Sequence, residues 1–151
     1  RRGGPFVALN CAALAEGVAT RVGAIRESLA AVETHLPELS RLYEERLRKR
    51  IDDLNENASL TEERIAIEVA LMAEKADVTE EVVRLRSHLD QMAELLDVDE
   101  PVGRRLDFLS QEAQREVNTL GVKTRNGDVT REILNMKGEL EKIREQVQNI
   151  E

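Results

Sequence analysis

The stretch from Val78 to Leu96 reads VTEEVVRLRSHLDQMAELL, and it decides the fold class. Its apolar residues recur at steps of four, three, four, three and four positions, which is the spacing of one face of an α-helix. So regular a seam is narrower than the apolar face of an ordinary globular helix and is typical of coiled-coil packing. The residues that form it are Val78, Val82, Leu85, Leu89, Met92 and Leu96.

The same spacing extends in both directions along the chain, and it predicts an all-α protein of about six helices. Pro37 is expected to end the first helix, and Gly121 is expected to stop the fifth. Long helices with narrow seams predict antiparallel hairpins in a coiled-coil-like bundle that associates with copies of itself. The predicted apolar stripes run over Leu14–Leu36, Leu39–Leu54, Ile65–Ala73, Val78–Leu96, Leu106–Leu120 and Ile133–Ile150.

Composition supports helices and excludes several classes of protein. Aromatic residues make up 2% of the 151 positions, and there are 8 glycines and 3 prolines, too few for the turns of a β-sandwich or barrel. A single cysteine excludes an internal disulfide, and no apolar run is long enough to cross a membrane. We therefore expect a cytoplasmic protein with no membrane partner. The absence of an initiator Met suggests a piece of a longer chain.

The net charge of −8 argues mildly against a generic nucleic-acid binder, which usually carries a basic surface. The sequence also lacks a Walker loop, a Cys/His metal motif and a nucleophile elbow. A local basic cluster at Arg46, Arg48, Lys49 and Arg50 is more typical of a solvated helix end than of an RNA-binding track.

A few polar residues stand out on the predicted helices. Glu112 and Glu116 are four residues apart, a spacing at which two carboxylates can share one hard divalent cation. His88 lies on one helical stripe with Arg84 and Glu81. On spacing alone the plainer interpretation is favoured: solvated helix faces with Glu–Arg pairs, and acids that stabilise helix starts.

Three longer stretches resemble the C-terminal half of the YicC/YloC family of bacterial endoribonucleases. They are EVALMAEKADVTEEVVRLRSH (68–88), GRRLDFLSQEAQREVNTL (103–120) and MKGELEKIREQVQNIE (136–151). The resemblance covers roughly residues 11–151, a helical C-terminal domain that in the family follows an N-terminal α/β half. Residues 1–10 do not fit it and are expected to be a non-family leader or a fusion scar.

The resemblance implies a cytoplasmic endoribonuclease that depends on a divalent metal cation, Mn or Mg, and acts on RNA rather than DNA. It also implies a ring-like homo-oligomer, with a hexamer expected for the full-length protein. The sequence departs from the family at Gln114, where Asn is usual, and at Val122, where Ser is usual. The loss of that hydroxyl puts a phosphate contact beside Lys123 in doubt.

Chemistry and motif position together assign roles to the matched residues. We expect His88, Glu112 and Glu116 to bind the metal or activate the attacking water, with Asp77 and Glu81 as further metal ligands. We expect Arg84, Arg115, Asn118 and Lys123 to bind the substrate and stabilise phosphate charge. The alternative hypothesis is a non-catalytic scaffold that assembles the oligomer, clamps RNA or serves as an adaptor for RNA degradation.

Overall fold

The computed structural model describes residues 5–56, 61–98 and 101–149, and side chains from residue 12 onward. Within these ranges the chain forms helices and no strands. The helices are α1 (Pro5–Glu56), α2 (Glu62–Ala76), α3 (Thr79–Leu95), α4 (Gly103–Thr124) and α5 (Gly127–Gln148). The all-α prediction is confirmed. The prediction of about six helices is wrong, because the first two predicted helices are one.

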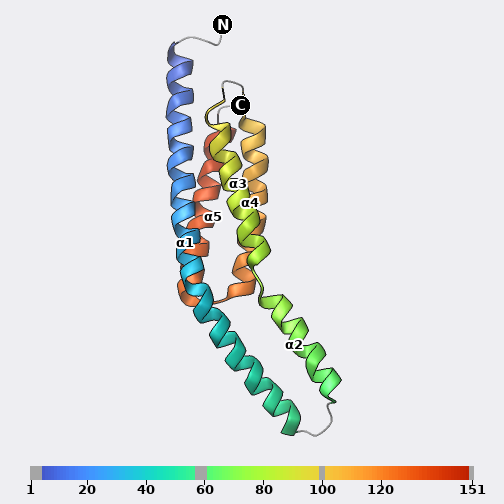
Figure 1. The fold of residues 1–151 in the computed structure, drawn as a ribbon. Coiled ribbons are helices and arrows are strands. Elements are labelled where there is room, and N and C mark those ends of the chain that lie inside the picture. Colours follow the sequence, from blue (N-terminus) through green and yellow to red (C-terminus); the bar gives the residue numbers. More distant parts are fainter. Residues whose placement is uncertain (1–4, 57–60, 99–100, 150–151) are drawn as a thin grey trace.

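Four helical segments lie side by side as a bundle: the N-terminal half of α1 together with α3, α4 and α5 (Figure 1). The C-terminal half of α1 leaves one end of this bundle, and α2 returns beside it (Figure 1). We call this projecting hairpin, residues 37–56 and 62–76, the arm. The α4–α5 turn lies at the end of the bundle from which the arm departs (Figure 1).

Pro37 does not end a helix, contrary to the sequence-based prediction, but lies inside α1. A proline in a helix interior removes one backbone hydrogen bond and pushes against the carbonyl four residues earlier, so it bends the helix. Figure 1 shows α1 changing direction where its colour passes from blue to teal, the region of the colour bar that includes this proline. The bend directs the arm away from the bundle.

The bundle core is almost entirely aliphatic, as the low aromatic content predicts. Leu85, Leu89 and Met92 of α3 are fully buried, so the seam over residues 78–96 is confirmed. The stripes of α1, α4 and α5 supply the other buried apolar side chains: Val18, Val22, Ile25, Leu29, Val32, Leu106, Leu109, Ala113, Val117, Leu120, Val129, Ile133, Met136, Leu140, Ile143 and Val147.

Gly121 is likewise no helix stop, because α4 continues to Thr124. A Cβ atom at this position would lie 3.1 Å from Cγ2 of Ile133, which is tighter than ordinary packing. The glycine therefore allows α5 to approach α4 closely. The turn that follows is short: Arg125 ends α4 with a left-handed backbone (φ 31°), and the Asn126 side chain accepts the backbone N–H of Asp128 at the start of α5.

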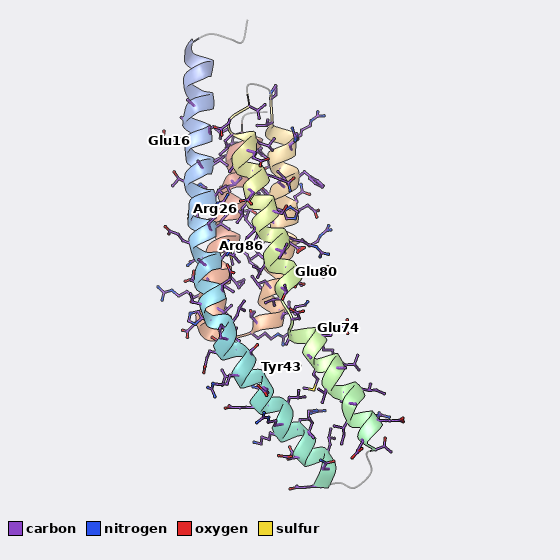
Figure 2. The ribbon with its side chains drawn as sticks, viewed as in Figure 1. Glu16, Arg26, Tyr43, Glu74, Glu80 and Arg86 are labelled. Atoms are coloured by element: carbon purple, nitrogen blue, oxygen red, sulfur yellow. The ribbon has the colours of Figure 1, made fainter. Side chains whose placement is uncertain are left out.

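The arm is much less buried than the bundle. None of the described residues of α2 is buried, so the predicted burial of Ile65, Val69, Ala70 and Ala73 is wrong, and the last two are exposed. Tyr43 of α1 donates its hydroxyl to the Met72 carbonyl and holds α2 against α1 (Figure 2 marks Tyr43 on the arm). Thr61 caps α2 by accepting the backbone N–H of Arg64.

Ion pairs join α1 to α3 along the bundle surface. Arg26 of α1 lies 2.8 Å from Asp90 of α3, and Arg86 of α3 pairs with Glu33 of α1 (Figure 2 labels both arginines between the two helices). None of the helices in the described ranges is both long and apolar enough to cross a membrane.

The buried seam of α3 can be tested by truncation. Replacement of fully buried Leu89 by Ala leaves a cavity and should lower the free energy of unfolding by about 2–5 kcal/mol. The matched control is Val83→Ala on the same helix, whose side chain is 61% exposed and whose loss should cost within about 0.5 kcal/mol. Urea unfolding followed by circular dichroism measures both, and equal losses would contradict this account of the seam.

Candidate functional site

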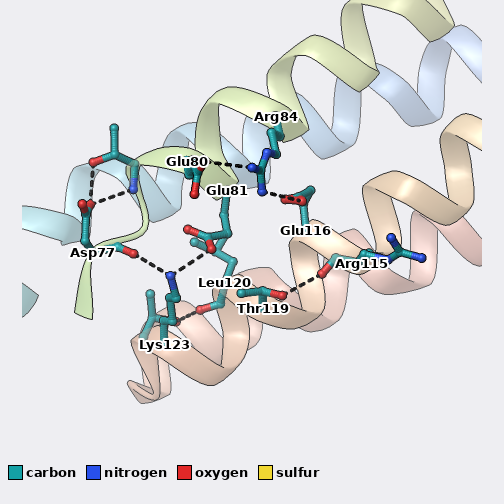
Figure 3. A network of polar contacts seen from close by, with 11 residues as sticks. Asp77, Glu80, Glu81, Arg84, Arg115, Glu116, Thr119, Leu120 and Lys123 are labelled. Carbon is teal, nitrogen blue, oxygen red and sulfur yellow. Dashed lines mark hydrogen bonds and ion pairs between the residues drawn. The ribbon is translucent and has the colours of Figure 1, made fainter. Parts of the chain in front are cut away.

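The face between α3 and α4 gathers most of the residues singled out from the sequence. The two helices run antiparallel, because Glu81 contacts Lys123 while Arg84, one turn later on α3, contacts Glu116, earlier on α4 (Figure 3). We call this the α3–α4 face. It carries two linked groups of charged side chains, one around Lys123 and one around Arg84 (Figure 3).

Lys123 ties the end of α4 to the start of α3. Its ammonium donates to Oε2 of Glu81 at 2.9 Å and to the backbone carbonyl of Asp77, also at 2.9 Å. The Glu81 side chain is only 7% exposed and that of Lys123 is 26% exposed, so water screens this pair weakly. Lys123 was predicted to bind phosphate, and in this structure protein acceptors hold its ammonium.

Asp77 organises the link between α2 and α3. Its carboxylate accepts the hydroxyl of Thr79 at 2.6 Å and the backbone N–H of the same residue at 3.0 Å. These hydrogen bonds, with a smaller contribution from the positive charge of Lys123, hold the pKa of Asp77 below its ordinary value. The N-cap position of α3 is Val78, and Asp77, one residue earlier, satisfies the first backbone N–H of the helix, which agrees with the helix-start interpretation of the sequence.

Arg84 lies between two carboxylates on different helices. Its guanidinium is 2.8 Å from Glu80, one turn earlier on α3, and 3.8 Å from Oε1 of Glu116 on α4 (Figure 3). The Glu116 side chain is 10% exposed. Its second oxygen, Oε2, is buried and finds no hydrogen-bond partner among the described residues, and the same holds for Oε1 of Glu81.

The remaining predicted site residues lie further along the two helices. The antiparallel register places His88 level with Glu112; both are half-buried, and Nδ1 of His88 is buried without a hydrogen-bond partner in the described residues. Glu112 lies 3.7 Å from Arg115 of its own helix. Arg115 and Asn118 are exposed, and Asn118 makes no side-chain hydrogen bond within the described ranges.

The described part of the chain holds no complete metal site. The described His, Cys, Asp and Glu side chains contain no group of three or more placed to hold a metal ion. The five predicted metal ligands, His88, Glu112, Glu116, Asp77 and Glu81, are therefore spread along the α3–α4 face. Glu81 has Lys123 as its partner, while Glu116 keeps one oxygen free of partners among the described residues. Metal binding by these residues stays a prediction.

Sequence reasoning gave no site role to Glu80, although it fixes the guanidinium of Arg84. Its signal was present, since Glu80 precedes Arg84 by four residues, the spacing of a favourable helical ion pair. The burial of Glu81 and Glu116 had no comparable signal. It depends on which turns of α3 and α4 face each other, and this register is set by packing rather than by either helix alone.

Comparison with known proteins identifies the family. The model of the family "Endoribonuclease YicC-like, C-terminal" matches residues 32–151. The chain belongs to this family. It is 41% identical over 139 residues to a probable endoribonuclease YicC of Clostridioides difficile (strain 630), an alignment that covers 91% of this chain and 47% of that protein.

A second relative leads to the same conclusion. The probable endoribonuclease YicC of Haemophilus influenzae (strain ATCC 51907 / DSM 11121 / KW20 / Rd) is 36% identical over 131 residues, which is 87% of this chain and 45% of that protein. The chain thus spans about half the length of the curated relatives it matches. The resemblance to the YicC family stated from the sequence is confirmed, and the α3–α4 face lies wholly within the matched region.

The Glu81–Lys123 pair can be measured with a double-mutant cycle. Lys123→Met leaves a buried carboxylate without its cation and should lower the free energy of unfolding by about 1–3 kcal/mol. Adding Glu81→Gln removes that charge, so the double variant should lose less than the sum of the single variants, with a coupling of about 0.5–3 kcal/mol. The matched control is the exposed pair Arg48–Glu44, with an expected coupling of about 0.3–0.5 kcal/mol. Equal coupling in both pairs would contradict the structural role of Lys123.

The lowered pKa of Asp77 predicts a dependence of stability on pH. Because the pKa is lower in the folded than in the unfolded chain, the carboxylate stabilises the fold above its unfolded pKa. That contribution disappears as the pH falls through the folded value. Asp77→Asn should therefore lower the Tm at pH 7, and its Tm should converge with that of the wild type in the acid range below about pH 4. Asp52→Asn, on the exposed arm, is the control, and a gap that stays constant down to low pH would contradict the assignment.

Proposed function

We propose that this chain is the helical part of an endoribonuclease that hydrolyses RNA phosphodiester bonds, and that the reaction requires a divalent cation, Mn or Mg. Membership of the YicC-like family supports the activity, and the α3–α4 face supports its location. The observation that carries the location is the pair of buried carboxylate oxygens, Glu81 Oε1 and Glu116 Oε2, without partners among the described residues.

The α3–α4 face offers the groups that such a reaction needs. Arg115 and Arg84 have side chains that are 73% and 53% exposed, so their guanidinium groups can reach an RNA phosphate and stabilise its negative charge. His88 and Glu116 lie on the same face, where an imidazole and a carboxylate can accept or release a proton. Glu80 holds Arg84 in place by a 2.8 Å ion pair, so we propose it as a positioning residue.

A divalent cation would lower the pKa of a bound water and neutralise phosphate charge. Magnesium is often bound by one or two carboxylates together with substrate phosphates, rather than by a complete protein cage. Glu116, with Glu112 one turn away on α4, fits that limited role. A metal site that the described residues of one chain do not complete is consistent with the proposed homo-oligomer, a hexamer for the full-length protein. We propose that this protein acts in the cytoplasm.

Cleavage of a labelled structured RNA on a gel tests the proposal. The purified chain should cleave the RNA with Mn²⁺ or Mg²⁺ and should be inactive when a chelator replaces the metal. Glu116→Gln and His88→Ala should each reduce the rate by about a hundredfold or more if the groups transfer protons. Glu141→Gln, an exposed change on α5, is the matched control.

The melting temperature gives an independent measurement of metal binding. Millimolar Mn²⁺ should raise the Tm of the wild type by mass action and should do so less for Glu116→Gln. Metal-independent cleavage would contradict the metal requirement. A folded chain that neither cleaves RNA nor responds to metal would contradict a catalytic site on the α3–α4 face and leave this part of the protein as a scaffold.

A further inference from the structure

A cavity of about 380 Å³ lies where the arm leaves the bundle, and it adjoins the α3–α4 face at Lys123 and Asp77. Four parts of the chain that are distant in sequence meet there: the middle of α1, the end of α2, the start of α3 and the α4–α5 turn (Figure 1). We call it the junction cavity. Its volume falls in the range of small-molecule binding sites.

The charged side chains that line the junction cavity are mostly cationic. Arg46 of α1, Lys123 of α4 and Arg125 of the α4–α5 turn contribute positive charge, and Asp77 contributes the one carboxylate among the lining residues. Hydrogen bonds from Thr79 already satisfy that carboxylate. In a chain with a net charge of −8, such a convergence of cations from three elements is unusual and suits an anion.

Two of these cations remain available for a ligand. On the arm, Arg41 pairs with Glu38 and Glu45, and Arg48 pairs with Glu44, whereas Arg50 also lacks an ion pair in the described ranges but lies outside the cavity lining. Within the described ranges no carboxylate forms an ion pair with Arg46 or with Arg125. Both arginines are exposed, so solvent and ligands can reach them.

The backbone at Arg125 gives a second, independent observation. Its φ of 31° is the one positive value among the described non-glycine residues, and a left-handed backbone is costly for a side chain with a Cβ atom. Glycine is the residue that ends helices in this conformation without strain. A large cation therefore occupies a position that favours glycine for the fold alone, and it lies in the lining of the cavity.

The face of α1 that lines the junction cavity is mostly apolar up to Arg46. Leu36, Leu39, Leu42 and Tyr43 line it, and the Tyr43 hydroxyl is already engaged by the Met72 carbonyl. Burial raises the pKa of that hydroxyl, so Tyr43 stays neutral at physiological pH. An apolar surface with one aromatic ring, next to Arg46 on the same face of α1 and in one cavity with Arg125, matches the two halves of a nucleotide: a base that stacks and a phosphate that pairs with arginine.

We infer that the junction cavity binds one nucleotide unit of single-stranded RNA, with Arg46 and Arg125 on the phosphate and the Tyr43 wall against the base. The inference rests on the proposed function, because it takes RNA as the substrate, and it adds a binding site that adjoins the α3–α4 face at Lys123. An RNA strand held here lies next to Lys123, where α4 meets that face.

Intrinsic fluorescence can report on this cavity alone, because the chain has one tyrosine and no tryptophan. A short single-stranded oligoribonucleotide, added in the presence of a chelator to prevent cleavage, should quench the fluorescence of Tyr43. Free N-acetyltyrosinamide at the same RNA concentrations corrects for absorption by the bases. Fluorescence anisotropy of an end-labelled copy of the oligonucleotide measures total binding in parallel.

Paired variants separate the cavity from general charge effects. Arg46→Gln with Arg125→Gly removes both free cations, and it should weaken oligonucleotide binding at least tenfold and reduce the quenching of Tyr43. Arg48→Gln with Arg131→Gln removes the same total charge from exposed positions outside the cavity lining and should change the affinity less than threefold. Arg125→Gly alone should give a Tm at least as high as the wild type, because glycine relieves the left-handed strain, so weaker binding would not reflect unfolding.

The outcomes distinguish the cavity from the activity. If the oligonucleotide binds without quenching Tyr43, or if the two double variants lose affinity equally, nucleotide binding in the junction cavity would be contradicted. RNA would remain the proposed substrate. If the wild-type chain does not bind the oligonucleotide even at low salt, nucleotide binding in the junction cavity would be contradicted. That result would also count against RNA as a ligand of this chain. If the chain cleaves RNA in a metal-dependent way but Arg46→Gln with Arg125→Gly binds the oligonucleotide as tightly as the wild type, nucleotide binding in the junction cavity would be contradicted. The proposed function would stand.

Discussion

The continuity of α1 through Pro37 is the constraint on which the rest of the structure depends. One half of this helix is buried against α3 and α5, and the other half has no bundle beneath it. Because the helix bends without ending, the arm emerges at a defined place, beside the α4–α5 turn. The junction cavity and its convergence of cations exist only because these elements meet there.

On the α3–α4 face, the residues proposed for chemistry also serve folding. Hydrophobic burial of the seams fixes the register of the two helices, and that register brings Glu81 to Lys123 and Glu116 to Arg84. A buried carboxylate is costly unless it is paired, so each of these contacts limits how the helices can slide. Each acid nevertheless keeps one oxygen without a partner in the described ranges, an arrangement that packing alone does not require.

Apolar periodicity predicted the bundle well, because the spacing of apolar residues within one helix is enough to indicate which of its faces is buried. It failed at Pro37 and Gly121, two residues that usually end a helix but lie inside α1 and α4, and at Gly121 the close approach of Ile133 on α5 gives the glycine a packing role. It also failed on α2, because an amphipathic pattern shows that a face can be buried but not what covers it. For the candidate site, spacing placed Arg84 and His88 on one stripe of α3, but it could not give their partners on α4, which depend on interhelical register. The roles of these residues stay predictions.

The unbroken backbone of α1 also makes the arm a lever. Its outer 20 residues, 37–56, span about 30 Å at 1.5 Å per residue. A tilt of roughly 10° about the bend at Pro37 would displace the tip of the arm by about 5 Å, with no helix broken. The same tilt would widen or narrow the space between Arg46, which travels with the lever, and Arg125, which is fixed to the bundle. Any load on the tip is thereby converted into a change in the distance between two positive charges.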